Sequence, residues 1–489
     1  MDLIYKNLSD LVDMVSTGEV SSEEVTKSFL SQSEKHNTDI NAFISMNPNA
    51  IEEARAIDKK RASGEKLGKL AGIPIGVKDL LCTKGLKTTA ASKILCNFIP
   101  PYDSTVVQRL RQQGAVILGK TNLDEFAMGS SNETSFYGPV KNPWNRAYVP
   151  GGSSGGSAAA VCARMAPATI GTDTGGSIRQ PANFCGIVGI KPTYGRVSRY
   201  GIVAFASSLD QAGPMANNVR DAVIVAESIS GHDKFDQTSS AQPVPEWSRS
   251  LKADLSGMTV GLPKEYFTDA IQDDVRQVID NAIEVIKGAG AQIKEVHLPL
   301  VEHAVSIYYL VATSEASSNL SRYDGVRYGY RADFEERPAE SLAEFYSRTR
   351  GEGFGSEIKR RIMLGTYALS SGYYDAYYKK ACQVRRLIQQ EFVDAFKQCD
   401  VLLSPVTTTP AFKFGERIKD PIQMYSNDIF TTSTNLAGLP GMSVPGGFTK
   451  NGLPVGVQLT ASHFQEQKMY DVAYAVEKTL NLSEVPNGL

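Results

Sequence analysis

The sequence predicts an α/β protein: a single large α/β/α domain built around a mixed, twisted sheet. With 489 residues and 42% hydrophobic content, the chain can bury a large core, although length alone would also allow two to four domains. Strand-like and helix-like segments begin to alternate near residue 72. A strand–helix–strand unit at 258–299 is typical of parallel strands, in a sheet that carries helices on both faces.

The first half of the chain supplies most of this alternation. The helix at 103–114 has the clearest ends, because Asp103 or Ser104 can cap its start and Gly114 can stop it. The expected elements are helices at 8–36 and 48–63, a strand at 73–81, the helix at 103–114, a strand at 115–121, a helix at 157–165 and a buried strand at 166–173.

The second half contains the strand–helix–strand unit and a long helical stretch. Strands at 258–263 and 291–299 flank a helix whose apolar residues keep helical spacing from Val275 to Ile286. Residues 357–398 are helical and rich in tyrosine, and strands leading into proline- and glycine-rich loops follow. The polar stretch 232–252 is either a domain boundary or a surface connection that returns to the same sheet.

These elements suggest a division of the chain into two parts of unequal size. We expect residues 1–65 to form an N-terminal helical segment packed on the core, and residues 66–489 to form the main domain. Within the main domain, a core at about 70–215 should precede a C-terminal part at about 255–489.

Charge and cysteine content limit the partners and the compartment. The net charge of −2 and the pI of about 6.3 leave no basic excess, so any nucleic acid would be held mainly by a partner. Six cysteines without a CxxC motif indicate free thiols in a reducing compartment. No signal-peptide pattern and no apolar run of ~20 residues occurs, so we expect a cytoplasmic protein without membrane contact. Five histidines without metal-ligand spacing predict no bound metal.

GAVILGKT at 114–121 matches the pattern of a phosphate-binding loop. That mechanism needs a loop with free backbone N–H groups between a strand and a helix. Here the intervening residues are Ala-Val-Ile-Leu, which predict a buried strand whose N–H groups are used in the sheet, and a helix precedes them. We therefore interpret the match as an ordinary helix-to-strand turn.

Two glycine- and serine-rich loops carry the chemistry: PGGSSGGSAAAV at 150–161 and GTDTGGSIRQP at 171–181. Flanking apolar segments argue against a linker, which leaves an anion cradle, a structural loop or a serine nucleophile. The nucleophile is favoured because the second loop follows a buried strand, and its N–H groups can converge into an oxyanion hole. The residues of that hole would be Thr174, Gly175, Gly176 and Ser177.

A serine nucleophile needs a base, and no histidine lies near either loop. Lys78, in the strand-like segment GVKDL, is the candidate. It is either an exposed lysine on an edge strand or a buried lysine kept neutral. Acting near pH 7 requires a pKa shift of about 3 units, roughly 4 kcal/mol, which burial can supply.

Lys78, Ser153 and Ser177, in GVKDL, PGGSSGGSAAA and GTDTGGSIRQPA, resemble the Ser-Ser-Lys triad of the amidase signature family. The resemblance covers nearly the whole chain and is most specific from about 140 to 215. It implies that Ser177 is the nucleophile, that Lys78 is the base, and that Ser153 carries the proton between them from an unusual cis peptide. The family's activity is cleavage of amide bonds.

The flanking segments narrow the resemblance. The stretches 314–331, 359–380 and 424–441 resemble the glutamine-hydrolysing subunits of aminoacyl-tRNA amidotransferases. This resemblance implies that Arg361 and Asp428 bind glutamine, with Tyr308 nearby. Arginine suits a carboxylate, and aspartate suits an ammonium group. From the residues alone, Arg361 could instead lie on a solvated face with Lys359 and Arg360, and Asp428 could be a helix cap.

The same resemblance implies a heterotrimer that converts Glu-tRNA(Gln) to Gln-tRNA(Gln). This chain would supply ammonia and need no cofactor, while two other subunits would bind the tRNA and use ATP with Mg²⁺. The alternatives are a stand-alone amidase acting on small amides, a scaffold with a vestigial triad, and a nucleotide-binding protein using 114–121. Cys185 lacks a basic partner in the sequence, and we interpret it as a core residue.

Overall fold

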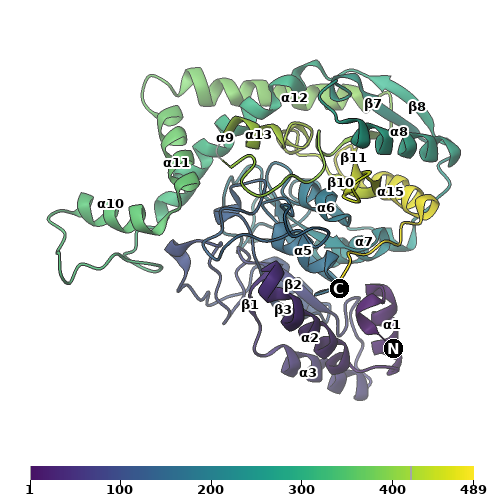
Figure 1. Ribbon diagram of the computed structural model, residues 1–489, viewed down its shortest axis with the longest axis horizontal. Helices are drawn as coiled ribbons and strands as arrows, with labels where there is room; N and C mark the ends of the chain where they lie inside the picture. The colour runs from purple at the N-terminus through teal and green to yellow at the C-terminus, as the bar shows by residue number, and fades with distance from the viewer. Residues whose placement is uncertain (1, 419–420, 489) are drawn as a thin grey trace.

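The computed structural model describes residues 2–418 and 421–488. One continuous mixed sheet runs through the molecule (Figure 1). In the described residues it has eleven strands, in the order β1-β3-β2-β4-β6-β5-β10-β11-β9-β7-β8. Their bounds are β1 (Phe43–Met46), β2 (Pro74–Lys78), β3 (Val116–Thr121), β4 (Ala168–Asp173), β5 (Val188–Lys191), β6 (Gln211–Ala216), β7 (Thr259–Pro263), β8 (Gln292–Val296), β9 (Val401–Pro405), β10 (Gly441–Phe448) and β11 (Pro454–Ala461).

Helices surround this sheet, which confirms the predicted α/β class. Helices α5 and α6 pack on each other and on the sheet, while α7 and α8 pack with α15 in a separate group. The bounds are α1 (Leu8–Thr17), α2 (Ser22–Ile40), α3 (Ala50–Ala62), α4 (Thr105–Gln112), α5 (Gly155–Cys162), α6 (Arg179–Cys185), α7 (Val219–Ile229), α8 (Asp273–Gly288), α9 (Ala304–Asn319), α10 (Leu342–Gly353), α11 (Ser356–Leu369), α12 (Lys380–Ala395), α13 (Pro421–Ser426), α14 (Thr432–Leu436) and α15 (Glu466–Leu480).

The middle of the sheet places Lys78 beside the second glycine- and serine-rich loop. Strand β2 lies between β3 and β4 and runs parallel to both, and every residue of β2 and β4 is buried. Parallel neighbours end at the same edge of a sheet. Lys78 at the end of β2 therefore lies next to the loop that follows Asp173 at the end of β4.

The predicted strand–helix–strand unit is present as β7, α8 and β8, with β7 and β8 parallel. Strand β7 also pairs with β9, so the chain after 232–252 returns to the same sheet. That polar stretch is therefore a surface connection and not a boundary between sheets.

Two long predicted helices are interrupted. The stretch 8–36 is two helices, because Gly18 adopts a φ of +81° at the end of α1 and Ser21 begins α2 with a capping box. The stretch 357–398 is broken between α11 and α12, where Gly372 has a φ of +89° and a π-helical turn, Asp375–Lys379, follows.

The predicted N-terminal segment is not entirely helical. Strand β1 pairs with β3 and extends the sheet by one strand at its edge. The boundary at residue 65 remains a prediction. At the other end of the molecule, α10 projects away from the body (Figure 1).

Candidate active site

Lys78 ends β2 inside the core. Its side chain is 0% exposed, and β2 has neighbours on both sides, so the edge-strand alternative is wrong. The ammonium nitrogen Nζ lies 2.9 Å from Ser153 Oγ, 2.8 Å from Ser154 Oγ and 2.9 Å from Thr172 Oγ1. Three hydroxyls thus hold the nitrogen in place, and Ser153 is one of them.

Burial lowers the pKa of Lys78 to about 7, although the carboxylates of Asp124, Asp173 and Asp210 act in the opposite direction. A buried ammonium group loses its hydration, which disfavours the charged form. A substantial fraction of Lys78 is therefore neutral near pH 7 and able to accept a proton.

The first glycine loop wraps tightly around Ser153. The peptide bond between Gly152 and Ser153 is cis, as the family resemblance implies. A β-carbon on Gly152 would lie 2.1 Å from Asp124 Oδ2, so only glycine fits there. The backbone N–H of Asp124 donates to the Ser153 carbonyl at 3.2 Å. The loop is thereby fastened to the segment that follows β3.

Ser177 lies beside the first loop and is 8% exposed. Its carbonyl oxygen accepts a hydrogen bond from the Ser154 N–H at 3.1 Å, which ties the two loops together. In the described residues the Ser177 hydroxyl makes no hydrogen bond, so the relay to Ser153 is not closed in this state. Hydrogen bonds of this kind often tighten only when substrate is bound.

The Asp173 carboxylate shapes the turn that carries Ser177. It accepts from the N–H groups of Gly176 at 2.9 Å and Ile178 at 3.1 Å, and it pairs with Arg179. Burial alone would raise the pKa of Asp173, but the Arg179 guanidinium holds it well below its usual range. A permanently charged carboxylate therefore organises the loop from beneath.

This arrangement corrects the predicted oxyanion hole at one position. The Gly176 N–H is already used by Asp173, so it cannot also point at a developing oxyanion. The N–H groups of Thr174, Gly175 and Ser177 donate to no acceptor in the described part of the chain. These three are the available donors, and Gly176 serves the turn through its φ of +137°.

Neighbouring side chains clamp the same loop. Thr174 donates its hydroxyl to Asp210 at 2.7 Å, and Thr431 donates to the Gly175 carbonyl at 2.6 Å. A β-carbon on Gly175 would meet the Tyr308 hydroxyl at 2.7 Å. Tyr308, predicted to lie near the substrate, therefore packs directly on the loop of residues 174–177.

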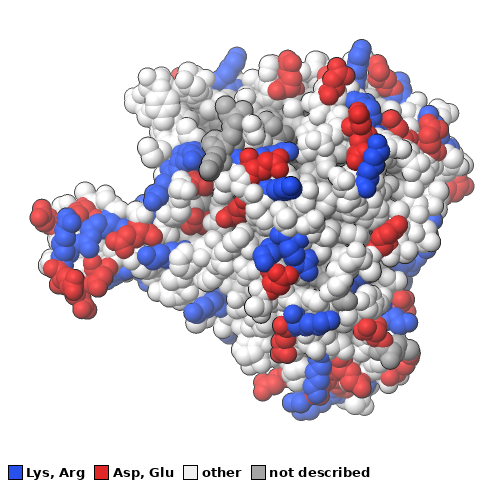
Figure 2. All heavy atoms as spheres, in the orientation of Figure 1, with Lys and Arg blue, Asp and Glu red and all other residues white. Residues whose placement is uncertain are grey.

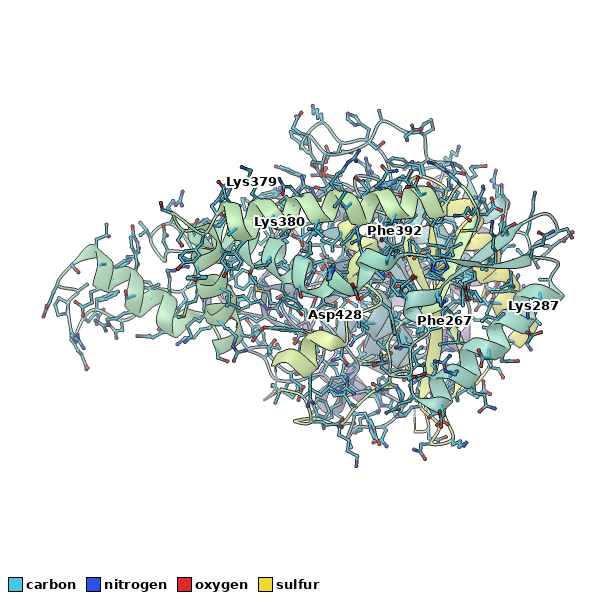
Figure 3. All side chains as sticks on the ribbon, turned by 90° about the horizontal axis from the view of Figure 1, so that it is seen from above. Phe267, Lys287, Lys379, Lys380, Phe392 and Asp428 are labelled. Atoms are coloured by element: carbon cyan, nitrogen blue, oxygen red, sulfur yellow. The ribbon has the colours of Figure 1, made fainter. Side chains whose placement is uncertain are left out.

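Arg361 and Asp428 are both buried, at 2% and 6% exposure (Figure 3 shows Asp428 within the body of the molecule). The solvated-face alternative for Arg361 is therefore wrong. In the described residues the Asp428 carboxylate accepts from Ser130 Oγ at 2.9 Å and Tyr309 OH at 3.4 Å, and from no helix N–H group. The helix-cap alternative for Asp428 is wrong as well.

The Arg361 guanidinium is held on one side and free on the other. Its Nε donates to Glu357 at 2.8 Å, and its centre lies 5.2–5.6 Å from three aromatic rings, those of Phe205, Tyr309 and Tyr425. Its two terminal nitrogens donate to no acceptor in the described residues. Such a fork can take a carboxylate in a bidentate pair.

Asp428 provides the opposite charge in the same region. It forms no ion pair with Arg361 in the described part of the chain, although the Arg361 charge acts on the pKa of Asp428. Burial raises the pKa of Asp428 to about 7, while Ser130 and Arg361 act to lower it. A ligand with an ammonium group would favour the charged carboxylate. The two groups together suit the α-carboxylate and α-ammonium of a free amino acid.

Comparison with known proteins agrees with this geometry. The sequence profile described as Amidase matches residues 24–469. The chain belongs to the amidase family. It is 63% identical over 477 residues to the A subunit of the glutamyl-tRNA(Gln) amidotransferase of Bdellovibrio bacteriovorus, with 98% of this chain and 97% of the relative covered.

Two solved structures of the amidase fold are also similar. The A subunit of the glutamyl-tRNA(Gln) amidotransferase of Thermotoga maritima superposes with a TM-score of 0.82 at 41% identity, over 99% of this chain and 98% of the other. The peptide amidase of Stenotrophomonas maltophilia superposes with a TM-score of 0.82 at 31% identity, over the same shares of the two chains. The amidase fold therefore serves proteins with different substrates.

Several residues at this amidase site were missed by the sequence analysis. Ser154 stands next to Ser153 and Tyr309 next to Tyr308, so adjacency alone was a weak signal for both. Glu357 stands four residues before Arg361 on α11, where an i,i+4 pair is a local signal. No local pattern marks Ser130 or Tyr425, because distant segments bring them to the site.

Other candidate features of the chain lie elsewhere. Cys185 is fully buried, and burial raises the pKa of its thiol well above the usual range, as expected of a core residue. Residues 116–121 form the buried strand β3, so the match to a phosphate-binding loop is a strand. The described residues hold no His, Cys, Asp and Glu group suited to a metal ion. No described helix is long and apolar enough to cross a membrane.

Proposed function

We propose that this chain is the glutamine-hydrolysing subunit of an aminoacyl-tRNA amidotransferase. It would supply ammonia for the conversion of Glu-tRNA(Gln) to Gln-tRNA(Gln). The observation that carries the proposal is the burial of Arg361 and Asp428 near the loop of Ser177 without an ion pair between them. The Nε of Arg361 pairs with Glu357, and its terminal nitrogens donate to no acceptor in the described residues. The names of the similar amidotransferase subunits support the same conclusion.

The proposed reaction begins with the transfer of the Ser177 proton through Ser153 to neutral Lys78. Ser177 Oγ attacks the side-chain amide carbon of glutamine, and the N–H groups of Thr174, Gly175 and Ser177 bind the oxyanion. The proton returns through Ser153 to the leaving ammonia. Water then attacks the acyl-enzyme and releases glutamate.

The recognition step rests on the two buried charges. Arg361 would hold the α-carboxylate of glutamine through its free terminal nitrogens, and Asp428 would hold the ammonium group. Tyr308, packed on Gly175, would form the wall between the binding pocket and the oxyanion loop. This arrangement orients the side-chain amide toward Ser177.

The remaining steps of the complex would take place on other subunits. The match at 114–121 is a buried strand, so it does not fit ATP. We therefore place the use of ATP and Mg²⁺, and most of the tRNA binding, on two partner subunits in a cytoplasmic heterotrimer. The near-neutral charge of this chain agrees with that division.

The second candidate is a stand-alone amidase, favoured by the similarity to the peptide amidase. Ammonia release from glutamine and from propionamide separates the two, because propionamide lacks both groups that Arg361 and Asp428 would bind. We expect kcat/KM to be at least ~10²-fold higher for glutamine. Equal values would favour the stand-alone amidase.

Replacement of Arg361 by lysine tests the recognition site. Lys keeps the charge but cannot form a bidentate pair, so kcat/KM for glutamine should fall roughly 10²-fold, corresponding to about 2–3 kcal/mol, mainly through KM. Activity on propionamide should not change. The matched control is Arg386→Lys on the exposed face of α12, which should leave both activities intact. An unchanged KM for glutamine in Arg361→Lys would remove Arg361 from the site.

A further inference from the structure

The corner where α11 meets α12 exposes an unusual number of large apolar and aromatic side chains. We call it the aromatic corner, and Figure 2 shows this corner of the molecule largely free of charged atoms. Large contiguous apolar surface is uncommon on proteins that work alone, and it often marks a binding site. Its members, with their exposure, are Met363 (71%), Leu364 (49%), Tyr367 (49%), Tyr373 (42%), Tyr374 (45%) and Tyr377 (37%).

The aromatic corner is a preformed surface. The Tyr367 ring lies 4.5 Å from that of Tyr373 and 5.9 Å from that of Tyr377, measured between ring centroids. The π-helical turn Asp375–Lys379 buries none of its residues. The rings pack against one another at the surface. Binding of a partner would therefore cost little conformational entropy to order them. Tyrosine and methionine are also the residue types enriched in the cores of protein interfaces.

The surround of the corner is mainly basic. Lys359, Arg360, Lys379 and Lys380 are exposed around it, and Figure 3 shows the last two at the start of α12. Two of these cations pair with carboxylates, Lys379 with Asp375 at 3.3 Å and Arg360 with Glu357. The matching surface would be an apolar ridge flanked by carboxylates. The exposed aliphatic side chains Met363 and Leu364, with the packed rings of the corner, favour a protein over a nucleic acid.

The aromatic corner lies close to the proposed glutamine site. Helix α11 carries Arg361 on its buried side and Met363, Leu364 and Tyr367 on its outer side, and it packs along α9, which carries Tyr308. A partner on the outer side would therefore lie one helix away from the proposed glutamine site. Ammonia that must reach another subunit without escaping requires a partner close to where it forms.

We propose that the aromatic corner is the docking face for a partner subunit of the amidotransferase, one that presents an apolar ridge with acidic flanks. This inference rests on the proposed function, since it takes its occupant from the complex. It adds the surface through which the complex is held together.

The test compares charge insertions at matched exposed positions. Met363→Glu and Tyr374→Glu each place a carboxylate in the corner, and Tyr5→Glu places one on a tyrosine of similar exposure, 44%, near the N-terminus. The full-length chains are titrated with the two partner subunits by analytical ultracentrifugation. We expect both corner variants to weaken assembly at least ~10-fold in Kd and Tyr5→Glu to leave it unchanged. Thermal melting and propionamide hydrolysis should match wild type in all three, because these side chains lie at the surface.

The outcomes separate this inference from the proposed function. Assembly of both corner variants with wild-type Kd would overturn the docking face and leave the proposed function standing. Normal assembly with weakened binding of Glu-tRNA(Gln) would assign the corner to RNA, which also overturns it. Failure of the wild-type chain to assemble with the partner subunits would overturn both. In the intact complex, hydrogen exchange of residues 363–377 should slow relative to the free chain; unchanged exchange would contradict the proposal.

Discussion

Ser177→Ala is expected to reduce ammonia release from glutamine by at least about 10³-fold, the effect expected when a covalent nucleophile is removed. The side chain is small and 8% exposed, and its hydroxyl makes no hydrogen bond in the described residues, so the fold should not change. Glutamine affinity, measured by calorimetry, should stay within a few-fold of wild type because Arg361 and Asp428 are intact. Loss of turnover with retained binding would be specific to the chemical step.

The control for this variant is Cys185→Ala, which removes the nearby buried thiol. Cys185 lies in the core with a raised pKa and should not take part in the reaction. Cys185→Ala should therefore keep wild-type turnover. Near-wild-type turnover in Ser177→Ala would rule out Ser177 as the nucleophile.

The second large effect concerns Lys78 and pH. The base must be neutral, and burial lowers the pKa of Lys78 to about 7. Below that pH the ammonium form predominates and cannot accept a proton, so kcat/KM should fall about tenfold per pH unit there. Above about pH 7 it should level off. Lys78→Arg remains charged at every pH of the assay and should lose at least about 10³-fold in kcat.

The choice of substrate separates the pH dependence caused by Lys78 from the pH dependence caused by Asp428. The pKa of Asp428 is also raised to about 7, and its deprotonation would strengthen binding of the glutamine ammonium group. Both effects would raise kcat/KM for glutamine with pH. Propionamide has no ammonium group, so Asp428 does not contribute to its profile. A flat profile for propionamide between pH 5.5 and 9 would contradict a lysine base.

Local patterns were sufficient to predict β2, which ends at Lys78, and β4, which leads to the loop of Ser177, as well as helix α4. Strands β2 and β4 come from apolar runs and are fully buried. Helix α4 begins after its predicted cap, Ser104. The antiparallel partners β5 and β6 were missed. Their pairing is non-local: β6 contains Gly213 and Pro214, which weaken any strand pattern, and β4 and β5 select its register.

The candidate site was predicted in part: its main loops and Lys78 were found, but several of its contacts were not. The two loops and Lys78 stood out because glycine pairs and a lysine in an apolar strand break the surrounding pattern. The use of the Gly176 N–H by Asp173 was missed, although an aspartate placed just before a turn commonly accepts from the backbone that follows. Thr431 and Ser130 reach the site from segments far along the chain, and contacts of that kind have no local signature.

The most direct test of the central claim follows the amide nitrogen. The chain, assembled with its two partner subunits, is given glutamine labelled with ¹⁵N at the side-chain amide, together with ATP, Mg²⁺ and Glu-tRNA(Gln). The account predicts that the label appears in the amide of glutamine on the tRNA, and that acyl-tRNA with ATP stimulates glutamine hydrolysis. Three results together would contradict the account: no label on the tRNA, glutamine hydrolysis unchanged by ATP and acyl-tRNA, and propionamide hydrolysed as readily as glutamine. The chain would then be a stand-alone amidase.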